Sequence, residues 1–480
     1  MSRQQFGSAN NSTKVLSFQK SGATASFDPN IIFSSGSGRV SWRLNNGSGI
    51  KQVAGNSIIY TGFTGDSNLR TIEMRGSSFK NINQFYLPDE NLYGNLNLSP
   101  IPNISGIIRM ENNPLLTGIT HSPSSGTISS YQAQSCNLTG ILDISMINTY
   151  TYFNVSSNPN LTQIIHNPTG STTSNYISYG CNLTGHHNMS MISGLSFCWL
   201  WNNPSLTGVT HGYSNANFIQ YWVSSCNLTG NHDLTMFPNL GGYFNVAGNN
   251  NLTGITHTAS TNVFTSYIAY NGLVGNLDLS MLSGLGGIIG LANNPNLTGI
   301  TLPISTQPIQ GFEIPSCNIT GTLSLSGFSS LGSISSATTS TFKFYSNSNL
   351  NNILFPIGDG YLSNDANNAI NAAIGLFSCN LGYVDFKPLS GCTILSGATV
   401  GLPRFELFDN VMTTADVNRV LSDFDLISTL NYSGWTATSG TTGGYINISL
   451  NSAPDGSSGG FNGTGATVNL VSKGWTVITD

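Results

Sequence analysis

A short pattern returns along most of this chain every 22 or 23 residues, and this period constrains the fold more than any other feature. In one version, Cys-Asn-Leu-Thr-Gly begins at Cys136, Cys181 and Cys226. A second version, with Asn in place of Cys, lies between them, for example at Asn158 and Asn203. Segments that repeat at such a period form similar units, which bury their apolar residues only against neighbouring units. The chain is therefore predicted to form a solenoid.

The alternating residue defines a ladder that continues well beyond these five positions. Each position holds Asn or Cys and belongs to one coil of the solenoid. The predicted ladder consists of Asn113, Cys136, Asn158, Cys181, Asn203, Cys226, Asn249, Asn271, Asn294, Cys317, Asn347, Cys379 and Asn410. After Cys317 the intervals lengthen to between 30 and 32 residues. This irregular end has room for a decorated loop, a contact with another subunit, or a short helix within residues 363–373.

Apolar residues precede each ladder position at fixed offsets. Phe244 and Val246 lie before Asn249, and the same spacing places Ile289 and Leu291 before the next Asn of that version. Alternation of this kind predicts a short strand with one buried face. A leucine follows most ladder residues two or three places later, as in Leu206, Leu228 and Leu381, so these coils should also bury residues beyond their turns.

The pattern L-x-L-x-x-N/C-x-L resembles the leucine-rich-repeat family, whose repeats are about 20 to 29 residues long. The resemblance covers roughly residues 63–412. It implies a leucine-rich-repeat solenoid of about thirteen coils, with a parallel β-sheet on a concave face and a mostly irregular convex side. Each coil of such a fold turns inward after its strand and leaves buried backbone groups that need partners. An Asn side chain both donates and accepts hydrogen bonds, and Cys is a small substitute with a weak donor.

Strand spacing limits what the seven cysteines can do. Adjacent strands lie about 4.8 Å apart, so cysteines on alternate coils should be about 10 Å apart. A disulfide needs Cα atoms within about 7 Å, and a zinc site needs ligands still closer together. We expect no disulfide and no metal within the ladder. Cys198 and Cys392 lie outside it and are expected to be reduced and buried.

Histidine and aspartate also recur at single repeat positions. His121, His166, His211 and His257 suggest metal binding at first sight, but the same spacing favours structural or solvent-facing roles. A second series comprises Asp143, Asp233, Asp278 and Asp385. An Asp at such a position most often caps a turn, and bound calcium is the alternative. The repeated Asn-Leu-Thr triplets match glycosylation sequons but arise from the repeat itself, so we interpret them as structural.

The two ends of the chain depart from the repeat and are predicted to cover the exposed apolar ends of the stack. Residues 1–62 show a strand-turn-strand pattern, and Trp42, Asn45, Gly47 and Tyr60 give this segment a similarity to small β-modules of the polycystic-kidney-disease type. At the other end, residues 412–425 predict a helix with Thr413 or Thr414 as its N-cap. Strands and turns should follow to the end of the 413–480 segment.

The order of this last segment is a helix, a strand, an Asn-x-Ala-Pro-x-Gly turn and a terminal Lys-Gly-Trp-Thr-Val. It resembles the C-terminal segment of leucine-rich-repeat proteins encoded by tailed bacteriophages. Such proteins are usually virion or tail-associated. The longer connection over residues 436–444 is the departure from that pattern.

Composition narrows the function classes. Only 7% of residues are charged, and 15 basic against 20 acidic residues give a net charge of −5. Nucleic-acid binding needs clustered Lys and Arg, so we do not expect it. No apolar run has the length of a secretory signal peptide or a membrane span, so we expect neither export nor membrane insertion. No nucleophile, zinc or phosphate-binding motif appears, so we expect neither an enzyme nor a cofactor.

The concave face is predicted to carry an aromatic patch. Tyr179, Trp199, Trp201 and Trp222 flank buried strand positions on successive coils, which lie about 5 Å apart. Exposed aromatic patches usually mark a contact with a protein or a ligand. One interpretation is that sugars stack on these rings, with Asn, Ser and Gln as hydrogen-bonding partners. The other is that the rings pack on each other and on a neighbouring subunit.

These observations predict a structural or interaction protein of a bacteriophage particle, either capsid-decorating or associated with the tail or fibre. Its partners would be other virion proteins and, on the concave face, a host-surface carbohydrate or protein. It would assemble in the host cytoplasm, where its cysteines stay reduced, and then be exposed on the head or tail. The alternative is a bacterial cell-surface leucine-rich-repeat adhesin, which should carry an export signal or a sorting tail.

Overall fold

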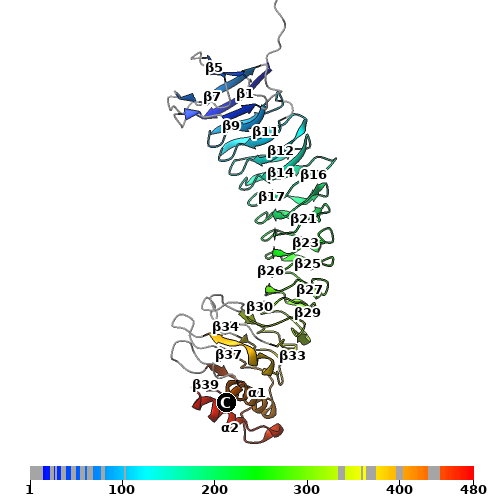
Figure 1. Ribbon diagram of the computed structural model, residues 1–480, viewed down its shortest axis with the longest axis vertical. Helices are drawn as coiled ribbons and strands as arrows, with labels where there is room; N and C mark the ends of the chain where they lie inside the picture. Colours follow the sequence, from blue (N-terminus) through cyan, green and yellow to red (C-terminus); the bar gives the residue numbers. More distant parts are fainter. Residues whose placement is uncertain are drawn as a thin grey trace, which may run out of the picture. The chain divides into compact units, whose positions relative to one another are not determined.

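Figure 1 shows the computed structural model as a ribbon coloured along the sequence. The chain forms two compact units, Met1–Ala216 and Asn217–Asp480. The residues that the structure describes are 14–21, 26–27, 30–33, 39–44, 50–54, 60–61, 69–76, 82–101, 104–332, 341–357, 361–363, 374–395, 404–430 and 444–480. The stretch predicted to add a short helix within residues 363–373 lies almost entirely outside them.

The first unit begins with antiparallel strands, as its turn-rich sequence predicts. β7 pairs with β1 and β4, and β4 pairs with β5. β3 pairs with β8, and β1 pairs with β9, so these strands are hydrogen-bonded to the first strands of the repeat region. The bounds are β1 Lys14–Ser21, β2 Ser26–Phe27, β3 Asn30–Phe33, β4 Arg39–Leu44, β5 Ile50–Ala54, β6 Tyr60–Thr61 and β7 Leu69–Gly76.

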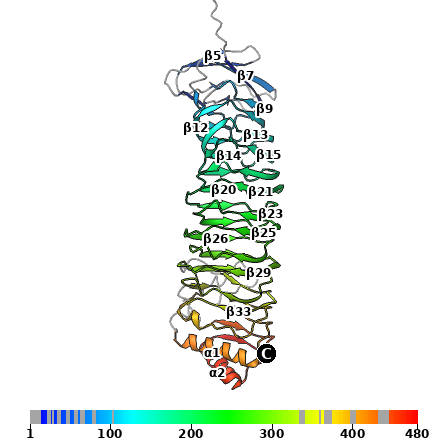
Figure 2. The same cartoon turned by 90° about the vertical axis from the view of Figure 1, so that its right-hand side faces the viewer.

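The rest of the first unit is a stack of parallel coils. One strand of each coil joins a parallel sheet, called here the main sheet. Its strands are β8 Ile82–Tyr86, β10 Gly106–Arg109, β12 Ser124–Gln132, β14 Ile147–Asn154, β17 Asn175–Ile177 and β20 Phe197–Trp199. The outward side of the main sheet is called the strand face. Figure 2 separates the main sheet from the second strands of the coils, for example β14 from β15.

The second strands form parallel pairs, each pair joining two successive coils. The pairs are β9 Leu92–Asn97 with β11 Leu115–Thr120, β13 Thr139–Asp143 with β15 Asn160–Ile165, β16 Ser171–Thr172 with β19 Ile192–Ser193, and β18 Gly185–Met189 with β21 Leu206–His211. The predicted irregular convex side is therefore wrong for these coils. In the Leu-Thr-Gly-Ile-Thr segment of β11, Leu116 and Ile119 are buried although they are three residues apart, because the strand register shifts between Leu116 and Gly118.

The second unit repeats this plan in its own parallel main sheet. The strands are β22 Gln220–Trp222, β24 Gly242–Asn245, β26 Phe264–Ile268, β28 Gly287–Gly290, β30 Ile309–Glu313, β32 Thr341–Lys343, β35 Ile374–Gly375, β37 Arg404–Glu406, β38 Tyr445–Asn447 and β39 Thr476–Ile478. Its paired second strands are β23 Thr229–Asp233 with β25 Asn251–Thr256, β27 Val274–Asp278 with β29 Asn296–Thr301, β31 Gly321–Ser324 with β33 Leu350–Leu354, and β34 Tyr361–Ser363 with β36 Thr393–Leu395.

The helices of the second unit are inserted into its last coils. They are α1 Thr414–Leu430 and α2 Gly463–Ser472, with short 3₁₀ turns at Lys387–Gly391 and Ser458–Gly460. Thr413 is the N-cap, because its hydroxyl accepts from the Asp416 N–H while the Asp416 carboxylate accepts from the Thr413 N–H. The parallel sheet continues past α1 through β38 and β39. The segment from residue 413 is thus part of the stack, and the predicted boundary falls between two paired strands.

Aromatic side chains fill the core of each unit in stacks that follow the coils. In the first unit the ring of Phe153 lies between Tyr131 and Tyr176, with centroids 5.4 and 5.1 Å away. In the second unit Phe244 lies between Tyr221 and Tyr267 at 5.5 and 4.6 Å. The strand positions predicted to be buried, including Phe244 and Ile289, are fully buried. No helix in the described part of the chain is long and apolar enough to cross a membrane.

Candidate functional site

The Asn residues of the ladder bind backbone groups of two coils at once. Asn158 Nδ2 donates to the carbonyls of Ala133 and Val155 at 2.9 and 2.8 Å. Its Oδ1 accepts from the N–H of Leu138 at 3.0 Å. Asn158 is completely buried, where an unsatisfied backbone group would be costly. The ladder is therefore a structural feature of the core and does not belong to the strand face.

The Cys residues perform only half of this task. Cys181 Sγ donates to the carbonyl of Val155 at 3.3 Å and accepts from the backbone N–H of Asn158 in the preceding coil. The Leu161 N–H needs no side-chain acceptor, because it is already bonded to the carbonyl of Asn158 within its own coil, at 3.0 Å. In the Cys coil, Leu183 follows its ladder residue by two positions, whereas Leu161 follows Asn158 by three. The Leu183 N–H donates to Asn203 Oδ1 at 3.0 Å. In Asn coils the leucine N–H is bonded within the coil, and in Cys coils it needs the Asn side chain of the next coil. This difference explains why Asn and Cys alternate from coil to coil.

The ladder prediction needs one correction. Asn271 has a φ of 68°, the left-handed conformation that elsewhere in the stack immediately precedes the ladder residue. Gly272 therefore occupies the ladder position of this coil, and its N–H donates to Asn294 Oδ1 at 2.7 Å. A Cβ on Gly272 would lie 2.6 Å from the carbonyl oxygens of Asn249 and Leu252, so this coil has no room for Cys.

The ladder also extends beyond its predicted end. Asn451 Nδ2 donates to the carbonyls of Leu407 and Ile448 at 3.1 and 2.9 Å, as the other ladder Asn residues do. Its interval from Asn410 is lengthened by α1, which hides the repeat in the sequence. The apolar Ile446 and Ile448 before it were the available sequence evidence, since both are buried like their counterparts in earlier coils.

None of the seven cysteines forms a disulfide, and all are buried, including Cys198 and Cys392. Burial raises the pKa of the Cys136 and Cys181 thiols to about 12. Burial likewise raises the pKa of Cys317 and Cys379 to about 11. A thiol in this state is a poor nucleophile and a poor metal ligand, so the ladder cysteines are suited to packing and weak hydrogen bonding.

The repeated aspartates cap turns, as predicted. Asp143, Asp233, Asp278 and Asp385 each accept a hydrogen bond from the backbone N–H two residues later, at 2.9 to 3.0 Å. This bond is an Asx-turn. Within the described residues, no group of three or more His, Cys, Asp or Glu side chains is arranged to hold a metal ion.

The recurring histidines contact buried tyrosines. His166 Nδ1 lies 2.7 Å from the hydroxyl of Tyr150, and its Nε2 lies 3.1 Å from that of Tyr176. The Tyr176 hydroxyl also contacts His187 Nε2 at 2.8 Å. Burial, and to a smaller extent the nearby His186, lowers the pKa of His187 to about 4. These imidazoles are therefore neutral at physiological pH.

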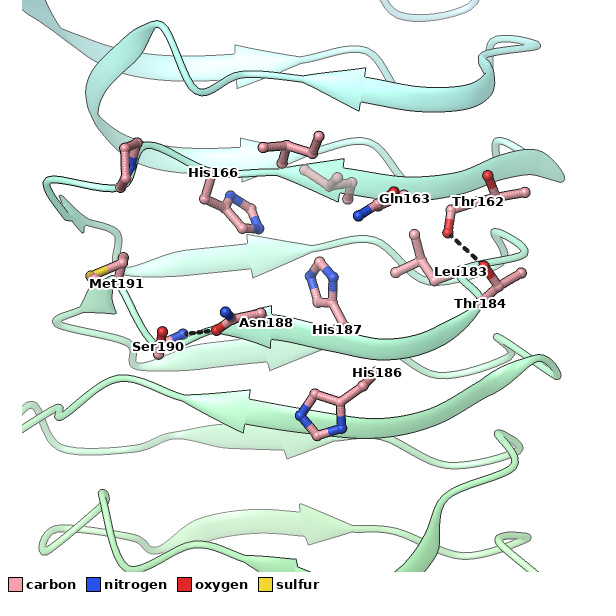
Figure 3. Close-up of a pocket in the computed structure, with 13 residues that line it drawn as sticks. Thr162, Gln163, His166, Leu183, Thr184, His186, His187, Asn188, Ser190 and Met191 are labelled. Atoms are coloured by element: carbon pink, nitrogen blue, oxygen red, sulfur yellow. Dashed lines mark hydrogen bonds between the residues drawn. The ribbon is translucent and has the colours of Figure 1, made fainter.

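A hollow of about 390 Å³ lies beside these histidines, between β15 and β18. It is bounded mainly by residues 162–168 and 183–191. In Figure 3 the ring of His187 points toward His166, whereas His186 points the opposite way. The ring centroids of His166 and His187 are 5.4 Å apart. Because both nitrogens of His166 contact tyrosine hydroxyls, this pair has a structural role in linking adjacent coils.

The predicted aromatic patch divides between the two units. In the first unit Tyr179 and Trp201 stack face to face, with centroids 4.2 Å apart and planes 6° from parallel. Trp199 lies 6.4 Å from Tyr179 and is half-buried. These three rings pack against each other, which is the intramolecular part of the second expectation; the neighbouring subunit in that expectation stays a prediction. Their contact leaves no gap of ring thickness between Tyr179 and Trp201.

Trp222 belongs to the second unit, where its surroundings are different. It is 40% exposed on the strand face, and the ring of Tyr243 on the next strand is 51% exposed. Together they border a hollow of about 210 Å³ whose other walls are Gln220, Tyr221, Asn245 and Ser266. Sequence reasoning missed Tyr243, although its place beside the buried Phe244 marks it as outward-facing.

A second aromatic stack lies farther along the strand face of this unit. Tyr345, Phe377 and Phe408 are stacked with centroids 4.5 and 4.6 Å apart and planes 7° and 6° from parallel. Each stands two residues before its ladder residue, as Tyr179 and Trp201 do. The sequence analysis did not connect these positions, because the lengthened coils place them 31 or 32 residues apart.

Comparison with known proteins found no matching family model, no matching curated protein and no matching solved structure. The geometry of the strand face is therefore the main guide to function.

Proposed function

We propose that this chain is a leucine-rich-repeat interaction protein that binds a partner through its strand face. The observation that carries the proposal is the exposed aromatic pair Trp222 and Tyr243, which borders a hollow on that face. Neighbouring exposed aromatic side chains often mark a contact with a protein or a ligand. The strand face is also built on hydrogen-bonded strands, which hold its side chains in fixed positions.

The leucine-rich-repeat assignment is part of this proposal. It is supported by one main-sheet strand per coil, by the buried Asn/Cys ladder and by the apolar residues that flank it. In such a stack the antiparallel strands at one end and the helices at the other would act as caps. Pairing of β3 with β8, and continuation of the main sheet into β39, are consistent with that role.

The proposed setting is a tailed-bacteriophage particle. Its support is the order of helix, strand, turn and terminal Lys-Gly-Trp-Thr-Val, which resembles the C-terminal segment of repeat proteins from such phages. Reduced, buried cysteines suit a protein that folds in a host cytoplasm before assembly. In this setting the strand face would bind either a neighbouring virion protein or a host-surface ligand.

A binding role without catalysis is the simplest proposal for the charged groups of the strand face. Lys343 Nζ lies 2.9 Å from Glu313 Oε1, and Arg404 lies 2.6 Å from Glu406 Oε1. Glycoside hydrolysis instead uses two carboxylates about 5 to 10 Å apart, facing a substrate. These acids are engaged by bases on their own sheet, an arrangement that stabilises the sheet.

The first test is to purify particles from the source, separate heads from tails, and identify this chain by peptide mass spectrometry. Stoichiometric recovery with one fraction is the expected result. Its absence from particles would overturn the virion proposal. Recovery on the outer surface of bacterial cells would favour the alternative, a repeat adhesin.

A second experiment addresses the strand face itself. Purified chain should compete with particles for adsorption to host cells, and the variant W222A should compete less well. Equal competition by both would show that adsorption does not depend on this part of the strand face.

A further inference from the structure

We propose that the hollow between β22, β24 and β26 is a binding site for one neutral sugar ring, such as the terminal residue of a glycan. The inference rests on the proposed function in taking the strand face as the binding face. It goes further by naming the site and the chemical class of its ligand. All its residues belong to the second unit.

The first observation is the arrangement of the outward side chains. The register of β22 and β24 places Gln220 beside Tyr243 and Trp222 beside Asn245. Each aromatic ring therefore lies beside an amide on the neighbouring strand. The two rings are diagonal neighbours, and so are the two amides. Ser266 extends the row of Tyr243 onto β26. Rings next to amides match the apolar C–H faces and polar edges of a sugar.

The second observation concerns hydrogen bonding. The amide of Gln220, the hydroxyls of Tyr243 and Ser266 and the Nδ2 of Asn245 have no hydrogen-bond partner among the described residues. They offer both donors and acceptors around one hollow. A polyol, which also both donates and accepts, can satisfy such a set. An aliphatic ligand would leave these polar groups without partners.

The third observation is that the site is already ordered. Trp222 Nε1 donates to Ser224 Oγ at 2.8 Å, which fixes the indole on the strand face. Asn245 Oδ1 accepts from the Ala247 N–H at 2.9 Å, so its Nδ2 is held outward. Side chains held in place lose little freedom on binding, which favours recognition of a small ligand.

Charge and size restrict the ligand. None of the six lining residues is Asp, Glu, Lys or Arg, so nothing in the wall would pair with a carboxylate, phosphate or ammonium group. The volume of about 210 Å³ holds roughly seven water molecules at about 30 Å³ each. It is smaller than the range of about 300 to 1,000 Å³ usual for drug-sized ligands. The hollow therefore matches a single ring in size.

The experiment uses the full chain and four probes: methyl α-D-glucopyranoside, methyl β-D-galactopyranoside, methyl N-acetyl-β-D-glucosaminide and N-acetylneuraminic acid. Saturation-transfer NMR and tryptophan fluorescence report binding. We expect at least one neutral methyl glycoside to bind and the acidic sugar not to bind. A glycan-end site accepts the blocked anomeric oxygen of a methyl glycoside, whereas a site for free sugar would accept only the unblocked parent sugar.

Variants locate the binding. W222A should lower affinity about tenfold or more, since it removes one ring from the site. W222F should retain most of the affinity, and Q220A should weaken it by loss of hydrogen bonds. Y213A is the matched control, because Tyr213 is 59% exposed in the first unit and lies outside the site. Equal thermal unfolding curves for all four variants would show that the fold is intact.

The outcomes separate this inference from the proposed function. Loss of glycoside binding in W222A but not in Y213A supports the sugar site. No binding of any neutral glycoside, or binding that W222A leaves unchanged, overturns it. If the chain then still competes for adsorption, the proposed function stands and the partner is a different ligand.

Discussion

At the residue scale, Asn and Cys are alternatives in the ladder but have different hydrogen-bonding roles. Asn158 supplies a donor for two carbonyls and an acceptor for the Leu138 N–H. Cys181 supplies one weak donor and a weak acceptor for the Asn158 N–H, but no acceptor for a leucine N–H. The choice between them is set by whether the preceding coil closes its own turn.

This difference predicts unequal costs for exchanging the two residues. N158C keeps a donor but leaves the buried Leu138 N–H without a partner, and should lower the free energy of unfolding by about 1 to 3 kcal/mol. C181A loses a thiol contact and a small volume, and should cost about 1 kcal/mol or less. Urea unfolding followed by circular dichroism measures both. A larger loss for C181A than for N158C would contradict the explanation.

Gly272 gives a second prediction at this scale, because the repeat consensus would replace it with Cys. G272C should destabilise the protein by about 1 to 3 kcal/mol, since its Cβ would meet two backbone carbonyl oxygens. N271G is the control, because glycine adopts a positive φ without strain. Thermal unfolding distinguishes them, and a stabilised G272C would show that this coil can widen.

At the element scale, the sequence predicted main-sheet strands well and the rest less well. Phe244 and Ile289 were identified as buried because alternation and ladder offset agree at each. The second strands were missed because their glycines weaken the strand pattern. Tyr243 was missed because an exposed residue is not constrained by the core. Its role depends on Trp222, which only the strand register brings alongside.

One buried side chain, Asn418, links α1 to the segment that precedes α2 in the second unit. Asn418 on α1 donates to Asp455 Oδ1 at 2.6 Å and to the carbonyl of Phe461 at 3.0 Å. It also accepts from the Asp455 N–H at 2.9 Å. Asn418 therefore connects α1 to the turn that leads into α2.

We expect N418A to destabilise these elements by about 2 to 4 kcal/mol, because it leaves several buried groups without partners. Hydrogen exchange should quicken in α1 and α2, with little change in β24 or β26. S422A, one turn further along α1, removes only a hydroxyl bonded to the carbonyl of Asn418 and is the milder control. Uniform quickening across the second unit would mean that the insertion and the stack unfold together.

At the scale of the whole molecule, buried neutral histidines make stability depend on pH in both units. Burial lowers the pKa of His121 and His187 to about 4 in the first unit and that of His257 to about 3 in the second. The unfolded chain binds these protons near pH 6.5. Folded stability is therefore fully present above pH 6.5 and is lost as the pH falls toward 4.

The last prediction follows from one of these residues. For His187, a pKa lowered from 6.5 to about 4 corresponds to roughly 3 kcal/mol lost between those pH values. H187L introduces the residue found at the matching positions 142 and 277. It should reduce the number of protons taken up on unfolding by about one, which lowers the slope of the unfolding free energy against pH. L142A is the control, since it should weaken the first unit about equally at all pH values. Urea unfolding at pH 7, 5.5 and 4.5 measures the slopes. An unchanged slope in H187L would mean that His187 is already protonated in the folded protein, and that its Nε2–H donates to the Tyr176 hydroxyl.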